Sequence, residues 1–253
     1  NLARHSPEIV YVDTISNPTL IVAGLEQIIT ISHRAGAKVI VDNTFATPFL
    51  CRPLEFGADL VIHSATKYFS GHGNITAGII CGNDKFLMKS AIEYRKYAGH
   101  MLSPDDAYRL TTQMKTFALR FTRQCQNASR MSKVLKAAGT VGKVLYPGLP
   151  EHPTHGEAVK LFGNRGFGGM ITFDFDGSGP DEKRDRRNSF IRSVSNKIKL
   201  IPSLGDPNTI LMPVESVWGA KYPEPGMIRL SAGFEDYQEL ESVVGDALEK
   251  LQN

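Results

Sequence analysis

Short apolar runs separated by longer segments are the feature that most constrains the fold of this 253-residue chain. In the first half, apolar runs predict strands at 8–14, 37–42, 59–63 and 77–81, and a helical spacing of apolar residues covers 20–35. Strands that are apolar on both faces and separated by helices indicate a largely parallel α/β sheet. Functional side chains in such sheets gather beyond the carboxyl ends of the strands. We therefore expect the chemistry of this chain at that edge.

The second half of the chain has a different pattern. A long helical pattern runs from Pro104 to about Ala138, with Ser103 as its expected N-cap. After it, strands are predicted at 141–146, 169–174, 199–202, 209–214 and 227–231, and helices at 181–196 and 237–251. Runs of strands flanked by helices indicate an α+β domain with a partly antiparallel sheet. We therefore predict two domains, 1–120 and 121–253, joined through the long helix.

Composition argues against several classes of function. A formal net charge of +3 does not indicate a nucleic-acid partner, and the basic cluster at 182–187 is interleaved with acids, which favours a solvated helix face over an anion-binding patch. Cys51, Cys81 and Cys125 are well separated, so they indicate a reducing compartment and match no metal site. The longest apolar runs are too short to span a bilayer, and no secretory signal is visible. We expect a cytoplasmic protein without a membrane partner.

Lys67 lies at the most informative position of the sequence. It follows the apolar run at 59–63 and is flanked by the hydroxyls of Ser64 and Thr66. Burial at the end of a strand lowers the pKa of a lysine toward neutrality, as a Schiff-base lysine requires. The two hydroxyls can bind a phosphate, and Asp42, at the end of another apolar strand, suits a pyridinium nitrogen. These are the groups that pyridoxal phosphate (PLP) needs from a protein.

Further motifs follow in a fixed order along the chain. They are Ser-Asn-Pro at 16–18, Val-Asp-Asn-Thr-Phe at 41–45, Ser-Ala-Thr-Lys-Tyr at 64–68, Gly-His-Gly at 71–73, Leu-Ser-Pro-Asp-Asp-Ala at 102–107, Ser-Leu-Gly at 203–205 and Arg-Leu-Ser-Ala-Gly-Phe-Glu-Asp at 229–236. With them, nearly the whole chain resembles the Cys/Met-metabolism family of PLP enzymes. That family includes methionine γ-lyase, cystathionine γ- and β-lyases, cystathionine γ-synthase and O-acetylhomoserine sulfhydrylase. Residues 41–48 and 71–78 are most similar to methionine γ-lyase.

The resemblance implies the type I PLP-enzyme fold, which is aspartate aminotransferase-like. A mostly parallel α/β cofactor domain would be followed by a smaller α+β C-terminal domain. Lys67 would form the Schiff base with PLP and move protons, and Asp42 would keep the pyridine nitrogen protonated. Ser64 and Thr66 would hold the phosphate. From the residues alone, Asp42 could instead cap a turn, and Lys67 could be an ordinary exposed lysine.

The resemblance also implies a substrate site. Arg229 would pair bidentately with the α-carboxylate of an amino acid, helped by Asn17 and Ser203. Two other interpretations stay open, a structural ion pair for Arg229 and a turn for Asn17, which precedes a proline. His63 and His72 lie near the site, and we expect them to make structural hydrogen bonds.

The expected activity is γ-elimination on methionine- or cystathionine-like substrates, as in a carbon–sulfur lyase. The alternatives are a γ-replacement enzyme and a non-catalytic truncated fragment, whereas a dehydrogenase is excluded because no strand is followed by a G-x-G-x-x-G turn. The family implies a homo-oligomer, a dimer of active dimers with shared sites. Family segments that precede 16–18 have no counterpart here, so we expect a piece of a longer protein. Residues 206–218 depart from the family pattern on the substrate side, so the resemblance does not define side-chain specificity.

Overall fold

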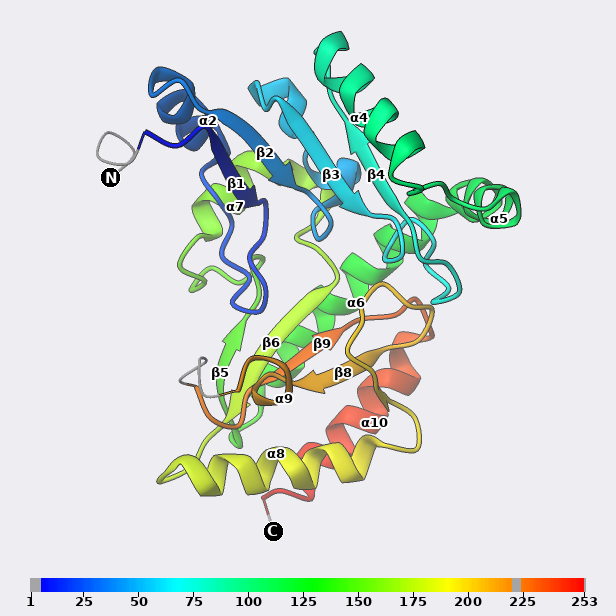
Figure 1. Cartoon of the computed structure of the whole chain (residues 1–253). Coiled ribbons are helices and arrows are strands. Elements are labelled where there is room, and N and C mark those ends of the chain that lie inside the picture. Colours follow the sequence, from blue (N-terminus) through cyan, green and yellow to red (C-terminus); the bar gives the residue numbers. More distant parts are fainter. Residues whose placement is uncertain (1–5, 220–223, 253) are drawn as a thin grey trace.

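Two β-sheets form the framework of the protein in the computed structural model, which describes residues 6–219 and 224–252 (Figure 1). The first sheet has the order β1-β2-β3-β4, with strands β1 (Ile9–Asp13), β2 (Lys38–Asp42), β3 (Leu60–Ser64) and β4 (Gly78–Cys81). Strands β1, β2 and β3 are parallel, as predicted, but β4 is antiparallel to β3. A parallel neighbour needs a crossover, usually a helix, and the chain between β3 and β4 contains none.

Three short helical elements accompany this sheet: α2 (Leu25–Arg34), α3 (Thr47–Leu50) and the 3₁₀ turn η1 (Pro53–Phe56). Leu25 and Ile29 of α2 are buried in one core with Val39 and Val41 of β2. The helix predicted over 20–35 begins only at Leu25, because Ile15 and Val22 form a β-bridge and hold the preceding loop. Leu20 and Val22 of that loop are buried core residues without helical geometry, whereas Ile21 is exposed.

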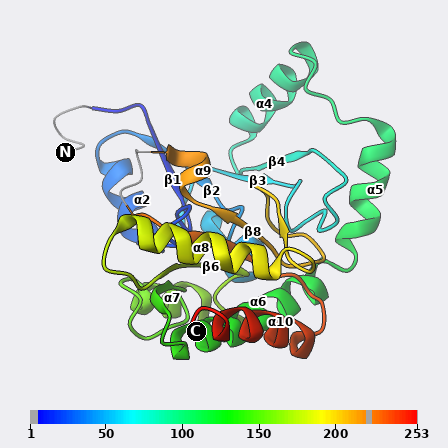
Figure 2. The ribbon, with the colours of Figure 1, turned by 90° about the horizontal axis from the view of Figure 1, so that it is seen from below.

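The long helix predicted over 104–138 is two helices, α5 (Pro104–Met114) and α6 (Phe117–Ala137). Ser103 caps α5 as expected, since its side chain accepts a hydrogen bond from the N–H of Asp106 at 3.1 Å. Before α5 lies a helix that the sequence pattern did not predict, α4 (Lys85–Tyr97), and none of its residues is buried. Helix α4 stands away from the rest of the molecule (Figure 2), whereas Leu110 of α5 is buried against the loop that follows β3.

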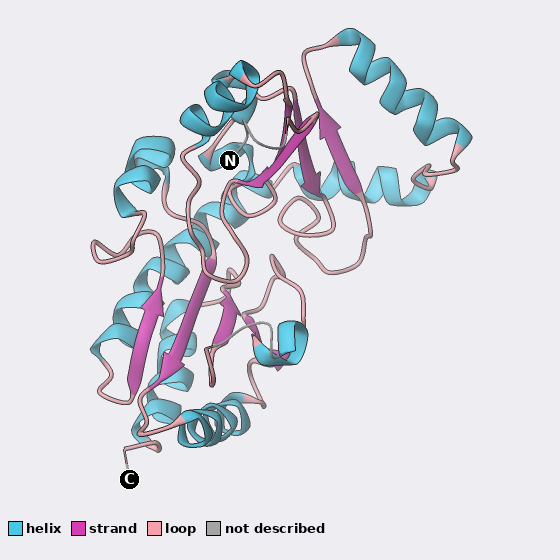
Figure 3. Ribbon diagram, turned by 60° about the vertical axis from the view of Figure 1, so that its left-hand side comes forward, coloured by secondary structure: helices cyan, strands magenta, loops and turns pink. Residues whose placement is uncertain are grey.

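The second sheet has the order β5-β6-β9-β8-β7, with β5 (Val141–Leu145), β6 (Met170–Phe175), β9 (Ile228–Ser231), β8 (Ile210–Pro213) and β7 (Lys199–Leu200). All its neighbouring strands are antiparallel except β7 and β8, so the prediction of a partly antiparallel sheet is confirmed. Figure 3 shows this sheet apart from the first one. Helices α6, α8 (Pro180–Val194) and α10 (Tyr237–Glu249) contribute to its core, and α6 and α10 lie side by side in Figure 2. The remaining short elements, α7 (His155–Phe162), η2 (Gly163–Arg165) and α9 (Glu215–Trp218), were not predicted.

Helix α6 connects the two cores. Phe121 and Cys125 near its start pack in the core of the first sheet, whereas Met131 and Leu135 further along pack in the core of the second. The boundary predicted between 120 and 121 thus falls within this helix and stays a prediction. Across the residues that the structure describes, every helix is too short or too polar to cross a membrane.

Candidate active site

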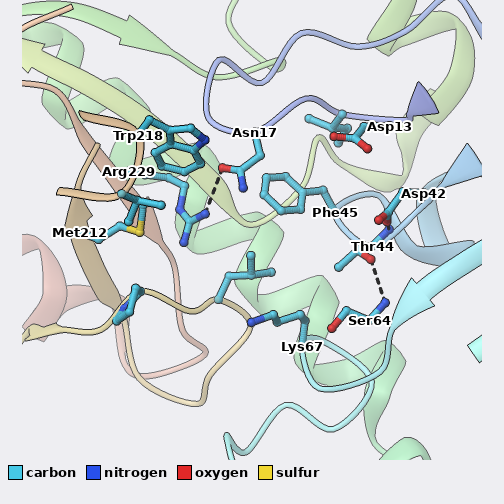
Figure 4. A pocket seen from close by; sticks show the side chains of 14 residues that line it. Asp13, Asn17, Asp42, Thr44, Phe45, Ser64, Lys67, Met212, Trp218 and Arg229 are labelled. Carbon is cyan, nitrogen blue, oxygen red and sulfur yellow. Dashed lines mark hydrogen bonds between the residues drawn. The ribbon is translucent and has the colours of Figure 1, made fainter. Parts of the chain in front are cut away.

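A cavity of about 310 Å³ is lined by residues of both sheets (Figure 4). Three of its polar residues, Asp13, Asp42 and Ser64, are the last residues of β1, β2 and β3. Parallel strands in register end at the same edge, and Asp13 and Asp42 are direct register partners. The expectation that polar groups converge at the carboxyl edge of this sheet is therefore confirmed.

Asp42 is held by two hydrogen bonds in this cavity. Its Oδ1 accepts from the N–H of Thr44 at 2.9 Å, and its Oδ2 accepts from the hydroxyl of Tyr11 at 2.9 Å. The first bond is the turn contact that the sequence left open, but Asp42 also lines the cavity, so a contact with a pyridine nitrogen stays a prediction. Burial, together with the neighbouring Asp42 carboxylate, raises the pKa of Asp13.

Lys67 lies in the loop that follows β3 and is half-buried. Its Nζ donates a hydrogen bond to the hydroxyl of Ser203 at 3.0 Å. Burial lowers the pKa of Lys67, and the cation of Arg229 lowers it further, while Asp206 acts in the opposite direction. The direction agrees with the expectation from the sequence, and the interpretation of Lys67 as an ordinary exposed lysine is wrong.

Arg229, in the middle of the second sheet, is only 4% exposed. Its Nη1 donates to Oδ1 of Asn17 at 3.0 Å, and its Nη2 donates to the carbonyl of Ser203 at 2.8 Å. Its Nε is buried without a partner. Burial lowers the pKa of Arg229 to about 10. Among the described residues no carboxylate pairs with this guanidinium, which argues against a structural ion pair and leaves the cation available to an anionic ligand.

The predicted phosphate-binding hydroxyls are placed differently from each other. Ser64 lines the cavity, and its backbone N–H donates to the hydroxyl of Thr44 at 2.8 Å. Thr66 is not among the described lining residues, and its hydroxyl accepts a hydrogen bond from the N–H of Ala77 at 3.0 Å. A phosphate contact of Thr66 stays a prediction.

The two nearby histidines make local contacts. His63 is buried with its ring in a T-shaped arrangement with that of Phe69, and its Nδ1 has no hydrogen-bond partner among the described residues. Nδ1 of His72 lies 2.6 Å from the carbonyl of Ser70, which is a structural hydrogen bond of the expected kind.

Several lining residues were missed by the sequence reasoning. Asp13 could have been found, because it ends β1 in the same way as Asp42 ends β2. Phe45 and Thr44 follow Asp42 directly and lie at the same edge. Met212 and Trp218 carry no local signal, since they reach the cavity only through the fold of the second sheet and of the loop after it.

Comparisons with known proteins agree with this geometry. Residues 2–249 match the family described as Cys/Met metabolism PLP-dependent enzyme. An L-methionine gamma-lyase of Fusobacterium nucleatum subsp. polymorphum is 34% identical over 265 residues, which cover 99% of this chain and 64% of the relative. A cystathionine beta-lyase of Lactococcus lactis subsp. cremoris is 35% identical over 256 residues, 98% of this chain and 65% of the relative.

Solved structures give the same result for the fold. The cystathionine gamma synthase of Xanthomonas oryzae pv. oryzae in complex with cystathionine superposes with a TM-score of 0.91 at 30% identity, over 99% of this chain and 65% of that one. The type I PLP-enzyme fold expected from the resemblance is therefore confirmed. The chain spans slightly less than two thirds of the length of these curated relatives. From its motifs, its fold and these similarities, the chain belongs to the Cys/Met metabolism family of PLP-dependent enzymes.

Proposed function

We propose that this protein uses PLP to cleave the bond between Cγ and sulfur in methionine- or cystathionine-like amino acids. One observation carries the proposal: Lys67, with a lowered pKa, lines one cavity with Arg229, a buried cation whose hydrogen-bond acceptors among the described residues are all neutral. A primary amine that can bind the cofactor and a guanidinium that can bind a carboxylate, in one cavity, suit an α-amino acid substrate. The relatives named lyases support the type of reaction.

The residues present fit the cofactor. Lys67 offers the amine that binds its aldehyde, Asp42 offers a carboxylate to its ring nitrogen, and Ser64 offers a hydroxyl to its phosphate, all in one cavity. When bound, PLP supplies an electron sink for the charge that develops at Cα of the substrate. The fixed carboxylate of Asp42 would favour the protonated form of the ring nitrogen, and a protonated ring withdraws electrons more strongly.

The other residues bind and orient the substrate. Arg229 binds the α-carboxylate, with Asn17 holding its Nη1 and the carbonyl of Ser203 holding its Nη2. The hydroxyl of Ser203 accepts a hydrogen bond from Nζ of Lys67, and its carbonyl accepts one from Arg229. Ser203 therefore positions the proton-transferring amine and the carboxylate-binding guanidinium relative to each other. Lys67 then takes protons from Cα and Cβ and, as the bond between Cγ and sulfur breaks, gives one proton to the sulfur, which leaves as a thiol. A neutral amine can act as the base in the first steps, and its protonated form as the acid in the last.

γ-Replacement is the second candidate, and the similarity to a cystathionine gamma synthase favours it. The two reactions differ in their products, because elimination gives a 2-oxo acid and ammonia and replacement gives a new thioether. We further propose a cytoplasmic homo-oligomer, a dimer of active dimers with shared sites, as the family resemblance implies.

The test is borohydride reduction of the PLP-loaded protein, followed by peptide mapping. We expect the pyridoxyl label on Lys67 and no label in Lys67→Ala, with turnover in that variant lowered by about a thousandfold or more because the nucleophile and the base are lost together. Lys89→Ala is the control, since Lys89 is exposed on α4. A label on another lysine, or no label at all, would reject the proposed role of Lys67, and the second result would favour a non-catalytic fragment.

A further inference from the structure

One end of the cavity has carboxylates and a hydroxyl, and at the other end apolar side chains lie beside a guanidinium. Asp13, Asp42 and Ser64 line the first, whereas Met212 and Trp218 lie beside Arg229 at the other (Figure 4). Met212 is the register partner of Arg229 on the neighbouring strand, so both side chains stand on the same face of the second sheet. Val217 precedes Trp218 and also lines this end. We call Met212, Val217 and Trp218 the apolar wall.

Two of the three wall residues belong to α9, a helix of four residues. A helix this short has no stability of its own, so its position depends on tertiary contacts. Glu215, its first residue, accepts hydrogen bonds from Nε of Arg184 at 2.9 Å, from Nη1 of Arg187, and from the N–H of Gly226 at 3.3 Å. Both arginines come from α8. Part of the cluster at 182–187 is therefore not the solvated face that its sequence suggested, since the side chain of Arg187 is only 11% exposed.

The electrostatics of this clamp favour the charged carboxylate. Burial opposes the charge of Glu215, but the hydrogen bonds from Arg184, Gly226 and Arg187 outweigh burial and hold the pKa of Glu215 below its ordinary value. Glu215 is therefore ionised at neutral pH, with an arginine on each oxygen. Removing its charge removes the counter-ion of both arginines and loosens the attachment of α9 to α8.

We propose that, among the proposed substrates, the apolar wall selects methionine-like amino acids, whose side chain is uncharged, over cystathionine-like ones, whose distal group is charged. Glu215 is the positioning residue that holds the wall. The inference rests on the proposed function, because Arg229 must first fix the α-carboxylate of the substrate. A side chain that leaves Cα next to Arg229 then meets Trp218 and Met212 (Figure 4). A thioether loses little hydration there, whereas a charged group loses its water without a partner on the wall.

Two six-carbon amino acids test the selection, because neither has a leaving group at Cγ. Norleucine ends in a methyl group and 2-aminoadipate in a carboxylate, so they differ only at the distal carbon. We expect the PLP-loaded protein to bind norleucine about tenfold to a hundredfold more tightly than 2-aminoadipate, because the distal carboxylate of 2-aminoadipate must lose its water at the wall. Calorimetry gives both affinities. Trp218 is the only tryptophan of the chain, so its fluorescence reports directly whether norleucine reaches the wall.

Glu215→Gln tests the clamp. It should shrink the preference for norleucine to about threefold or less and shift the Trp218 emission toward that of an exposed indole, while borohydride still labels Lys67. The matched control is Asp181→Asn, since Asp181 binds Arg184 at 2.9 Å but is 95% exposed and does not contact α9. The control should keep the parental preference and emission. Equal preference in Glu215→Gln and the parent protein would reject the positioning role.

Val217→Lys tests the wall by a gain of binding. Val217 is 53% exposed, so the longer side chain fits without disturbing a core. We expect 2-aminoadipate to bind about tenfold more tightly, because its distal carboxylate gains a cation at the wall. If Lys67 is labelled but the parent protein binds both amino acids equally, the wall is refuted and the proposed function stands. If Lys67 is not labelled, the proposed function itself fails.

Discussion

The two sheets contribute to the cavity in different ways. The first sheet offers the ends of its strands, where Asp13, Asp42 and Ser64 meet because β1, β2 and β3 are parallel and in register. The second sheet offers the face of its strands, where Arg229 stands beside Met212 and is 4% exposed. Polar groups at strand ends keep part of their hydration, whereas a guanidinium on a buried face needs partners for each of its donors. The first sheet thus suits a cofactor with several polar groups, and the second suits one carboxylate.

The sheets also differ in how completely their side chains are buried. Every residue of β6, β8 and β9 is buried. In the first sheet, Tyr11 of β1 is 57% exposed and Ile80 of β4 is 50% exposed, and α4 has no buried residue. Hydrophobic burial within the described chain therefore stabilises the second sheet far more than the outer strands of the first. The predictions below test these two contrasts.

The same substitution, Phe to Ala, should change the free energy of unfolding by very different amounts in the two regions. Phe190 of α8 is fully buried, with its ring centroid 5.8 Å from that of Phe173 in β6, so Phe190→Ala should lower the free energy of unfolding by about 3–5 kcal/mol. Phe86 of α4 is 76% exposed, so Phe86→Ala should change it by less than about 0.5 kcal/mol. Denaturant unfolding measures both. A loss for Phe86→Ala close to that for Phe190→Ala would show that the face of α4 is covered in solution.

Asp42→Asn tests the part that the first sheet plays in the chemistry. An amide cannot favour a charged ring nitrogen, so kcat should fall about a hundredfold to a thousandfold while PLP occupancy changes little. Steady-state kinetics and the absorbance of the bound cofactor measure the two quantities separately. Asp59→Asn is the control, because Asp59 precedes β3 at the opposite edge and pairs with Lys38 at 2.8 Å. If Asp42→Asn turns over like the parent protein, Asp42 is only the turn-capping residue seen in its bond to Thr44.

The features that depend on the local sequence pattern were the ones predicted best from the sequence. Apolar runs gave the four strands of the first sheet, and Asp42, Ser64 and Lys67 were placed correctly because their position follows from where a strand ends. The antiparallel direction of β4 was not predictable from its own residues, since it depends on how the 65–77 loop returns. Helix α4 was missed because its apolar residues face no core and so form no buried stripe.

Contacts between distant segments were beyond the reach of the sequence. The bond from Lys67 to Ser203 joins residues 136 positions apart, and the bond from Arg229 to Asn17 joins residues 212 apart. The family resemblance named these residues, but only the arrangement of the two sheets, which α6 connects, brings them to one cavity. The prediction of a solvated helix face at 182–187 was partly wrong for the same reason, because only the fold shows that Arg184 and Arg187 bind Glu215 of α9.

Arg229→Lys tests the part of the second sheet and is the smallest of these effects. Lysine keeps the charge but offers one point donor where arginine offers a planar fork, so the two parallel bonds to a carboxylate are lost. Asn17 and the Ser203 carbonyl, now bound at 3.0 and 2.8 Å, would also lose a partner. We expect the variant to lose about 2–3 kcal/mol of binding free energy, and KM to rise accordingly. The rise should be the same for methionine, cystathionine and O-acetylhomoserine, because each has the same α-carboxylate.

The pattern of these KM values distinguishes a substrate-binding arginine from a structural one. PLP occupancy and the label on Lys67 should stay unchanged, since Arg229 hydrogen-bonds neither to Ser64, the proposed phosphate ligand, nor to Asp42 in the described structure. If instead KM is the same for all three substrates as in the parent protein and the variant unfolds at a lower temperature, Arg229 only ties β9 to the Asn17 and Ser203 loops. In that case the α-carboxylate of the substrate binds elsewhere. The proposed division, in which the strand ends of the first sheet bind the cofactor and the strand face of the second sheet binds the substrate, would then be wrong.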